Sequence, residues 1–301
     1  MNSCVPINLL QRYKCDITNS ETLSYNVQHK YGPFFIWFVL AAHFGVCAKE
    51  KIKIEIDFRS GNGKCTFHFY PIDRQCPDHV RYDVIPVIIE GYWGPLESPS
   101  VHANVILIDH QEEVVEIFEP HSTIYQTASC YKEIIENFKI TYPGYLILSP
   151  EITCPIGLQT LEHKNTCFLW TLFYFFLRIH CSHLGRIQLI NSIADLHVVK
   201  PTRSILSWFQ SDINPISNII RGFGCYVKQL LDDLALGPFA HYHFQTTAKL
   251  FKHNKELVKE LHKFHETLDL NNYIKLLKSN NLYTSELDNI IKTNLFLSSV
   301  L

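Results

Sequence analysis

The sequence lacks the features that would place the protein in a membrane, on a nucleic acid or in a secretory pathway. Its most apolar run, residues 33–47, is interrupted by His43 and is shorter than the roughly 20 residues that a membrane-spanning helix needs. Its 27 Lys and Arg residues against 29 Asp and Glu leave a formal charge of -2, so it has no basic excess with which to bind nucleic acid. Residues 1–14 carry no basic segment followed by an apolar core, as a signal peptide would. We therefore expect a cytoplasmic protein without a membrane span or a nucleic-acid partner.

The sequence also lacks cysteine and histidine pairs at the spacings typical of metal sites. Its ten cysteines are scattered singly, and neither CxxC nor HxxxH occurs. We therefore expect free thiols in a reducing compartment, and no metal or other cofactor. The alternative is a zinc site assembled from residues far apart in the sequence, namely Cys154, His163, Cys167 and His102.

The composition and the local patterns that are present predict a globular α+β protein. Hydrophobic residues make up 47% of the chain and charged residues 19%, as in ordinary globular proteins. Residues 51–58 alternate strictly between polar and apolar side chains, and residues 64–70 alternate again after the turn sequence at 60–63, so we expect a hairpin. The apolar runs 34–48 and 168–179 predict buried helices. We predict a mainly antiparallel sheet with helices packed against it.

The remaining elements follow from shorter signals. We expect strands at residues 83–90 and 144–148, a helix at 123–139 and a loop at 150–165.

The chain changes character after residue 236. Gly237 and Pro238 form a turn signal, and the residues beyond them have apolar side chains at helical spacing with a Lys-rich opposite face. We predict a main domain over residues 1–236 and a helical C-terminal extension or subdomain over residues 237–301. We expect the protein to be a monomer.

Residues 101–121 predict a second hairpin that brings a histidine and a glutamate together. If its polar tip closes symmetrically, Asp109 faces Val114. The same register places His102 and Glu119 on one face as diagonal neighbours, which lie roughly 7–8 Å apart on facing strands. A glutamate side chain is long enough to reach an imidazole across that distance.

The same register excludes the other acid of this hairpin. Seven residues of extended chain place Asp109 roughly 23 Å from His102, too far for a contact. Asn104 faces Glu119, and His121 faces His102. We therefore expect Glu119 to be the partner of His102.

A nucleophile can come from the start of the second buried helix. Asn165 or Thr166 is suited to cap that helix, which places Cys167 in its first turn. Unpaired backbone N–H groups and the helix dipole favour a thiolate there. In chain order, the candidates for base, orienting acid, oxyanion donor and nucleophile are His102, Glu119, Gln159 and Cys167.

The segments HANVILID, EIFEPHS and GLQTLEHKNTCFLWTLFYFFLRI carry these candidates, and they resemble the cysteine peptidases typified by SUMO proteases and adenovirus protease. They look closest to the versions of large DNA viruses and of some intracellular bacteria. The resemblance covers residues 92–180. Many members have Trp after the histidine and Gly after the cysteine, where this chain has Ala103 and Phe168.

The resemblance implies a papain-like, adenain-like fold in which residues 1–236 form the catalytic domain. It implies thiol-dependent cleavage after the C-terminal tail of ubiquitin or a ubiquitin-like protein, in a host cytosol or nucleus if the protein is viral or a secreted effector. Because such tails end in Gly-Gly, the channel to the cysteine should be narrow. The residues expected to bind the substrate are Trp93, Asn104 and Trp170.

Three other interpretations stay open at this point. The same set of residues could process a polyprotein, as adenovirus protease does. It could transfer acetyl groups from acetyl-CoA, as some bacterial effectors do. That activity needs a basic pocket for the CoA phosphates, and the region around Cys167 offers only Lys164 and Arg178 for it. A non-catalytic binding module is the third, since a single cysteine on an apolar helix is usually a core residue.

Overall fold

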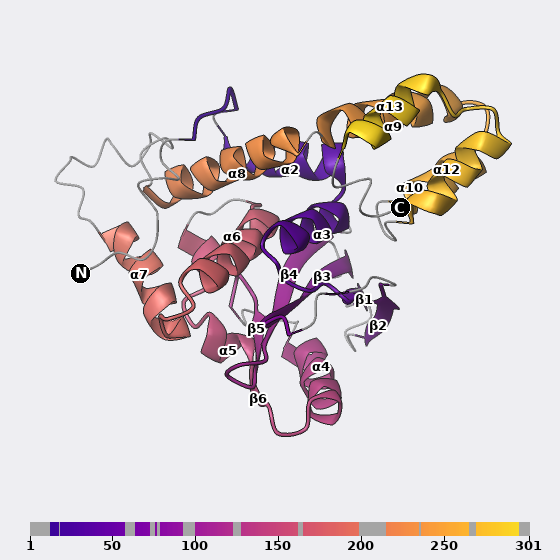
Figure 1. Cartoon of the computed structure of the whole chain (residues 1–301). Helices are drawn as coiled ribbons and strands as arrows, with labels where there is room; N and C mark the ends of the chain where they lie inside the picture. The colour runs from indigo at the N-terminus through magenta and orange to yellow at the C-terminus, as the bar shows by residue number, and fades with distance from the viewer. Residues whose placement is uncertain are drawn as a thin grey trace.

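The computed structural model describes residues 13–17, 19–57, 64–72, 76, 79–92, 100–122, 128–161, 165–198, 215–234, 236–264 and 269–294, and these form an α+β fold (Figure 1). The turn expected at residues 60–63 lies outside the described residues, and so does Trp93.

Six strands form a single mixed sheet in the order β2-β1-β3-β4-β5-β6. Three of its five contacts are antiparallel, whereas β1–β3 and β5–β6 are parallel. The expectation of a mainly antiparallel sheet is therefore confirmed. The two parallel pairings were not predicted. The strands are β1 (Glu50–Asp57), β2 (Lys64–Pro71), β3 (Tyr82–Tyr92), β4 (Ser100–Asp109), β5 (Val114–Phe118) and β6 (Leu146–Leu148).

Most of the predicted helices are present, with shifted ends. Residues 150–165, expected to be a loop, contain two short helices, because Pro150 can occupy the first turn of a helix at no cost in hydrogen bonds. The described helices are α2 (Ser20–Tyr31), α3 (Pro33–His43), α4 (Ala128–Thr141), α5 (Pro150–Thr153), the 3-10 helix η1 (Leu158–Leu161), α6 (Cys167–His180), α7 (Arg186–Val198), α8 (Pro215–Asp233), α9 (Leu236–Leu250), α10 (Lys255–His262), α12 (Leu270–Ser279) and α13 (Ser285–Thr293).

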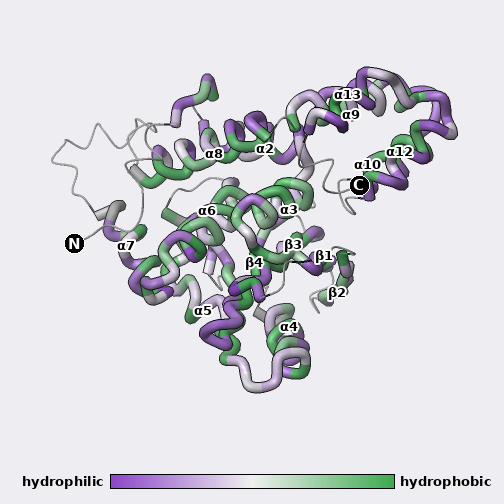
Figure 2. The backbone as a smooth tube through the Cα atoms, viewed as in Figure 1, coloured by the Kyte–Doolittle hydropathy of each residue, from purple (hydrophilic) through white to green (hydrophobic). Residues whose placement is uncertain are grey.

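Helices cover both faces of the sheet. Along β4, Val105 and Leu107 join a large core with α3 and α6, while Ile106 and Ile108 join a smaller core with α4. The polar–apolar alternation of this strand is blurred because both of its faces are buried. In Figure 2, α3 and α6 are mostly hydrophobic, as expected for helices packed in the larger core.

The C-terminal helices project from the main body but share its core (Figure 1). Phe264, next to the end of α10, packs against Phe35 of α3 with 5.8 Å between ring centroids. Gly237 and Pro238 occupy the first turn of α9, where a proline is tolerated. The boundary at residue 236 stays a prediction.

Six of the ten cysteines form disulfides, which corrects the expectation of free thiols. The pairs are Cys15–Cys225, Cys47–Cys76 and Cys65–Cys130. Their partners lie 210, 29 and 65 residues apart in the sequence, so spacing alone could not reveal the pairs. The free cysteines of the described chain are Cys154, Cys167 and Cys181.

Among the described helices, none combines the length and the apolar character that crossing a bilayer would require.

Candidate active site

The hairpin of β4 and β5 has the predicted register. Asp109 pairs with Val114, and the ladder continues to Val105 and Phe118. Just beyond the last pair, Nε2 of His102 lies 2.6 Å from Oε1 of Glu119. The predicted partnership is therefore confirmed as a geometry, and both side chains are buried.

Asp109, at the other end of the hairpin, has a different role. Arg81 donates two hydrogen bonds to its carboxylate, at 3.1 and 2.9 Å. The backbone N–H groups of Gln111 and Glu112 donate to the same carboxylate across the turn. Asp109 thus closes the tip of the hairpin and is not part of the candidate site.

Cys167 is the first residue of α6, as predicted, and its side chain is half-buried. Its thiol hydrogen-bonds to His102 and accepts from the backbone N–H of Ala103. Because β5 pairs with β4 only as far as Val105, the Ala103 backbone can face the helix that carries the thiol. The end of a strand ladder and the start of a helix therefore meet at Cys167.

The three side chains form a coupled ionic group. Burial opposes the thiolate of Cys167, yet the charge and hydrogen bond of His102 lower the pKa of the thiol below its usual value. Burial also opposes the imidazolium, but the charges of Glu119 and Cys167 raise the pKa of His102 well above its usual value. The pKa of Glu119 is likewise lowered against burial by His102. The geometry therefore favours a thiolate–imidazolium pair.

Glu119 is held by two further donors that the sequence did not indicate. The backbone N–H of His121 donates to Oε1 at 2.9 Å, and the hydroxyl of Tyr131 donates to Oε2 at 2.7 Å. Tyr131 comes from α4, on the face of the sheet opposite α6, and is buried. A buried carboxylate needs several donors, but only the packing of α4 shows which residue supplies the hydroxyl.

The loop that carries Gln159 is fixed against the turn after β5. The Gln159 N–H donates to the carbonyl of Pro120 at 2.9 Å. Gly157 has φ +65°, and a Cβ atom there would lie 2.7 Å from the carbonyl oxygen of His121. A side chain at position 157 would therefore push this loop away from the turn. Gln159 itself is 2% exposed, beside the turn that follows Glu119.

Two predicted substrate-binding residues lie in the interior, which corrects that expectation. Trp170 is one helical turn after Cys167, 1% exposed, and packs against Phe173 in the larger core. Asn104 is fully buried, and neither atom of its side-chain amide has a hydrogen-bond partner in the described chain. Sequence patterns identified both residues as near the site but could not show which way their side chains point.

The two residues at which the sequence differs from the pattern it resembles are both buried. Ala103, in place of the common Trp, is 3% exposed and contributes its backbone N–H. Phe168, in place of the common Gly, is fully buried in the core behind the nucleophile.

The zinc alternative finds no support in the described residues. No group of three or more His, Cys, Asp or Glu side chains within them is arranged to hold a metal ion. Burial raises the pKa of the Cys154 thiol to about 12, in contrast to that of Cys167. His163 lies outside the described residues.

Comparisons with known proteins are sparse. No family model matches the chain, and no solved structure matches it. The chain is 27% identical over 178 residues to a protein of Acanthamoeba polyphaga mimivirus named "Putative ankyrin repeat protein L371". The match covers 50% of this chain and 21% of that protein, so the chain spans about a fifth of its relative's length.

Proposed function

We propose that the protein is a cysteine peptidase that cleaves the bond after the C-terminal tail of ubiquitin or a ubiquitin-like protein. The observation that carries the proposal is the hydrogen-bonded series Cys167–His102–Glu119, in which the cysteine thiol has a lowered pKa and the imidazole a raised one. The resemblance of the sequence to SUMO and adenovirus proteases supplies the substrate class, and implies a papain-like arrangement of sheet and nucleophile helix.

The proposed reaction is acyl transfer through the cysteine. The Cys167 thiolate attacks the carbonyl carbon, and the resulting oxyanion is stabilised by the Cys167 N–H and by the amide of Gln159. As the carbon–nitrogen bond breaks, His102 gives its proton to the leaving amine. His102 then takes a proton from water, which attacks the thioester and releases the carboxylic acid and the thiolate.

Glu119 has an orienting role in this scheme. It binds Nε2 of His102, so Nδ1 is the ring nitrogen that exchanges a proton with the cysteine. The hydroxyl of Tyr131 and the N–H of His121 fix the carboxylate in turn.

Acetyl transfer from acetyl-CoA is disfavoured by the position of Arg178. Its guanidinium makes two hydrogen bonds to the buried Glu116, at 3.0 Å each, and its side chain is 3% exposed. It is therefore not available to bind the phosphates of CoA. Lys164 lies outside the described residues.

Activity-based probes test the proposal. We expect ubiquitin or SUMO carrying a C-terminal propargyl group to form an adduct at Cys167, located by mass spectrometry of the digested protein. Cys154→Ala and Cys181→Ala serve as matched controls, because both thiols are buried and should not react.

No adduct with any ubiquitin-like probe, combined with cleavage of an unrelated peptide by the same protein, would instead favour a polyprotein-processing peptidase.

A further inference from the structure

The first turn of α4 carries two residues that connect it to distant parts of the molecule. Cys130 forms a disulfide with Cys65 of the edge strand β2. Tyr131, the next residue, donates its hydroxyl to Glu119 at 2.7 Å. Because α4 begins at Ala128, both residues lie within about one helical turn of its start. The disulfide is therefore adjacent in sequence to a donor that holds the orienting carboxylate of the proposed active site.

The disulfide anchors the end of α4 that is most prone to open. Helix ends open more readily than helix centres, because the first four N–H groups have no partner within the helix. Ile134 and Phe138 hold the following turns of α4 in the smaller core. The disulfide adds a covalent tie from the first turn to the sheet. Opening it should therefore loosen the first turn and leave the rest of α4 in place.

A looser first turn would weaken the hydrogen bond from Tyr131 to Glu119. The carboxylate is 1% exposed, and it hydrogen-bonds to the ring of His102, the N–H of His121 and the hydroxyl of Tyr131. Tyr131 reaches it from α4, whereas the other two groups come from β4 and from the turn after β5. A buried carboxylate depends on its donors, so with one of them weakened Glu119 would hold the ring of His102 less firmly.

A small dithiol can open this disulfide from the side of Cys65. Cys65 is half-buried on β2, whereas Cys130 is 1% exposed. A thiolate of the reductant attacks Sγ of Cys65, the S–S bond breaks, and Cys130 leaves as a thiolate that takes up a proton. The second thiol of the reductant, once deprotonated, attacks the mixed disulfide, and Cys65 leaves and is protonated in turn. One disulfide is thereby reduced to two thiols, and one dithiol is oxidised to a cyclic disulfide.

We infer that the Cys65–Cys130 disulfide is a redox switch of the proposed active site, which is more active with the disulfide formed than with it reduced. The inference rests on the proposed function and names a means of its regulation. The effect passes from Cys130 through Tyr131 and Glu119 to His102. It requires no reaction of the reductant with Cys167.

The test measures kcat of the full chain for ubiquitin or SUMO joined to a fluorophore, in reduced and in oxidised dithiothreitol. Mass spectrometry after alkylation gives the state of each cysteine. We expect kcat to fall by roughly three- to tenfold on reduction, the net contribution of about one hydrogen bond, and to recover on reoxidation.

Two matched variants show which disulfide is responsible. Cys65→Ser should have the low kcat in both buffers, since it leaves Cys130 as a buried thiol. Cys76→Ser is the control, because it breaks another disulfide and likewise frees a cysteine, Cys47, that is 1% exposed. It should respond to reduction as the wild type does.

Two further measurements show whether the effect passes through Tyr131. Tyr131→Phe lacks the hydroxyl but keeps the disulfide, so reduction should change its kcat by less than about twofold. Hydrogen exchange followed by mass spectrometry needs no substrate. Reduction of the wild type should speed exchange at residues 132–135, whose N–H groups bond to the carbonyls of the first turn, and leave residues 138–141 unchanged.

The outcomes separate this inference from the proposed function. Equal kcat in the two buffers, with Cys65 and Cys130 shown to be free after reduction, would overturn the switch alone. The same holds if both cysteines are free in the oxidised buffer, or if Tyr131→Phe loses as much activity on reduction as the wild type. If the wild type cleaves neither substrate in either buffer, the proposed function fails. Hydrogen exchange then decides on its own whether the disulfide holds the start of α4, and unchanged exchange would overturn that link too.

Discussion

Two free cysteines of this protein have different thiol pKa values because their surroundings differ. Cys154 is buried, and burial raises the pKa of its thiol to about 12. Cys167 lies at a helix start beside His102, which lowers the pKa of its thiol in spite of burial. The adjacent imidazole therefore accounts for the lowered pKa of the Cys167 thiol.

Substitutions of the three candidate catalytic side chains should differ in severity. We expect Cys167→Ala to abolish turnover with the fold intact, and His102→Ala to reduce kcat/KM by roughly 10²–10⁴-fold because the general base is lost. Glu119→Ala should be milder than His102→Ala, since Glu119 orients the base. Steady-state kinetics and thermal melts of each variant check this.

Asp109→Ala is the control for the hairpin register. A larger loss of activity in this variant than in Glu119→Ala would contradict the assigned roles.

The pH dependence of alkylation should show the activated thiol. Because the pKa of Cys167 is lowered, its reaction with iodoacetamide should rise at a pH below the value of about 8.5 at which a free thiol titrates. His102→Ala should move that rise to higher pH, since the imidazolium no longer stabilises the thiolate. A rate profile for the folded wild type that matches a free thiol would remove the case for activation.

Tyr131→Phe should reveal how much the second donor to Glu119 contributes. The change removes one buried hydrogen bond to a charged group and keeps the ring, so we expect a loss of roughly 1.5–3 kcal/mol in the free energy of unfolding. Turnover should fall less than in Glu119→Ala. Chemical denaturation and kinetics measure the two effects, and unchanged stability would show that Glu119 does not depend on this hydroxyl.

At the scale of elements, one buried carboxylate joins two helices to the sheet. Glu116 of β5 is fully buried and accepts from Tyr174 at 2.6 Å and from both Arg178 and Arg186. These donors come from α6 and from the start of α7. The cluster thus fixes the helix that carries Cys167 at its other end.

Glu116→Ala should therefore act on stability. Removing the carboxylate leaves buried guanidinium groups without their counter-charge, which we expect to lower the free energy of unfolding by about 3–5 kcal/mol. Glu112→Ala, at the exposed hairpin tip, is the control and should change it by less than about 1 kcal/mol. Denaturant titration of both variants checks the prediction, and equal stability of the two would contradict it.

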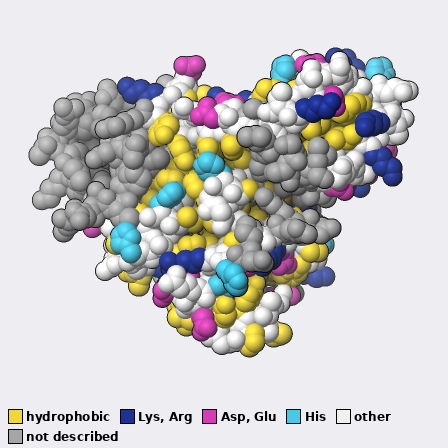
Figure 3. All heavy atoms as spheres, viewed as in Figure 1, with side chains coloured by type: hydrophobic (Ala, Val, Ile, Leu, Met, Phe, Trp, Pro, Cys, Tyr) yellow, Lys and Arg dark blue, Asp and Glu magenta, His cyan; other side chains and the backbone are white. Residues whose placement is uncertain are grey.

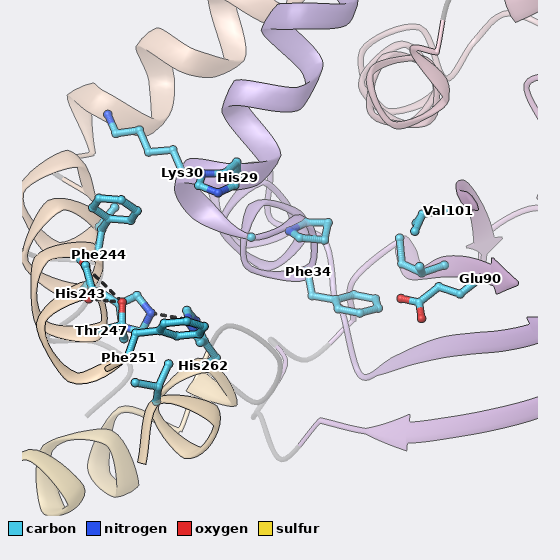
Figure 4. Close-up of a pocket in the computed structure, with 16 residues that line it drawn as sticks. His29, Lys30, Phe34, Glu90, Val101, His243, Phe244, Thr247, Phe251 and His262 are labelled. Atoms are coloured by element: carbon cyan, nitrogen blue, oxygen red, sulfur yellow. Dashed lines mark hydrogen bonds between the residues drawn. The ribbon is translucent and has the colours of Figure 1, made fainter. Parts of the chain in front are cut away.

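At the scale of the whole molecule, the C-terminal helices both extend the surface and complete the core. Phe264 covers Phe35, which is 2% exposed, and Phe239 and Leu261 belong to the same core. Hydrophobic side chains are exposed on these helices (Figure 3), and a groove lined in part by Phe244 and Phe251 lies between them and strands β3 and β4 (Figure 4). The C-terminal part therefore has a structural role, because it completes the core.

A chain that ends at residue 236 should consequently expose apolar surface. We expect it to bind a hydrophobic dye and to lose solubility, because Phe35 and its neighbours are uncovered. Size-exclusion chromatography and a thermal melt measure this. A soluble, cooperatively folded product that still reacts with a small activated substrate would show that residues 237–301 form a separable subdomain.

The sequence by itself determined the local parts of this protein. A tip that closes symmetrically predicts the hairpin register, and through it the contact between His102 and Glu119, because side chains alternate with a period of two. An apolar run of helical length after a capping residue predicts that Cys167 begins a helix. These features depend on neighbours within about twenty residues, so patterns along the chain are sufficient to reveal them.

Only the tertiary structure decided which distant groups meet. The hydroxyl of Tyr131 on Glu119, the cysteine pairs and the burial of Trp170 and Asn104 all depend on how elements pack across the sheet. The groove likewise joins α2, α3 and the sheet to helices more than a hundred residues later. Periodicity shows that a side chain lies on a buried face, but it carries no information on which element covers that face. That choice depends on the summed packing of the whole chain.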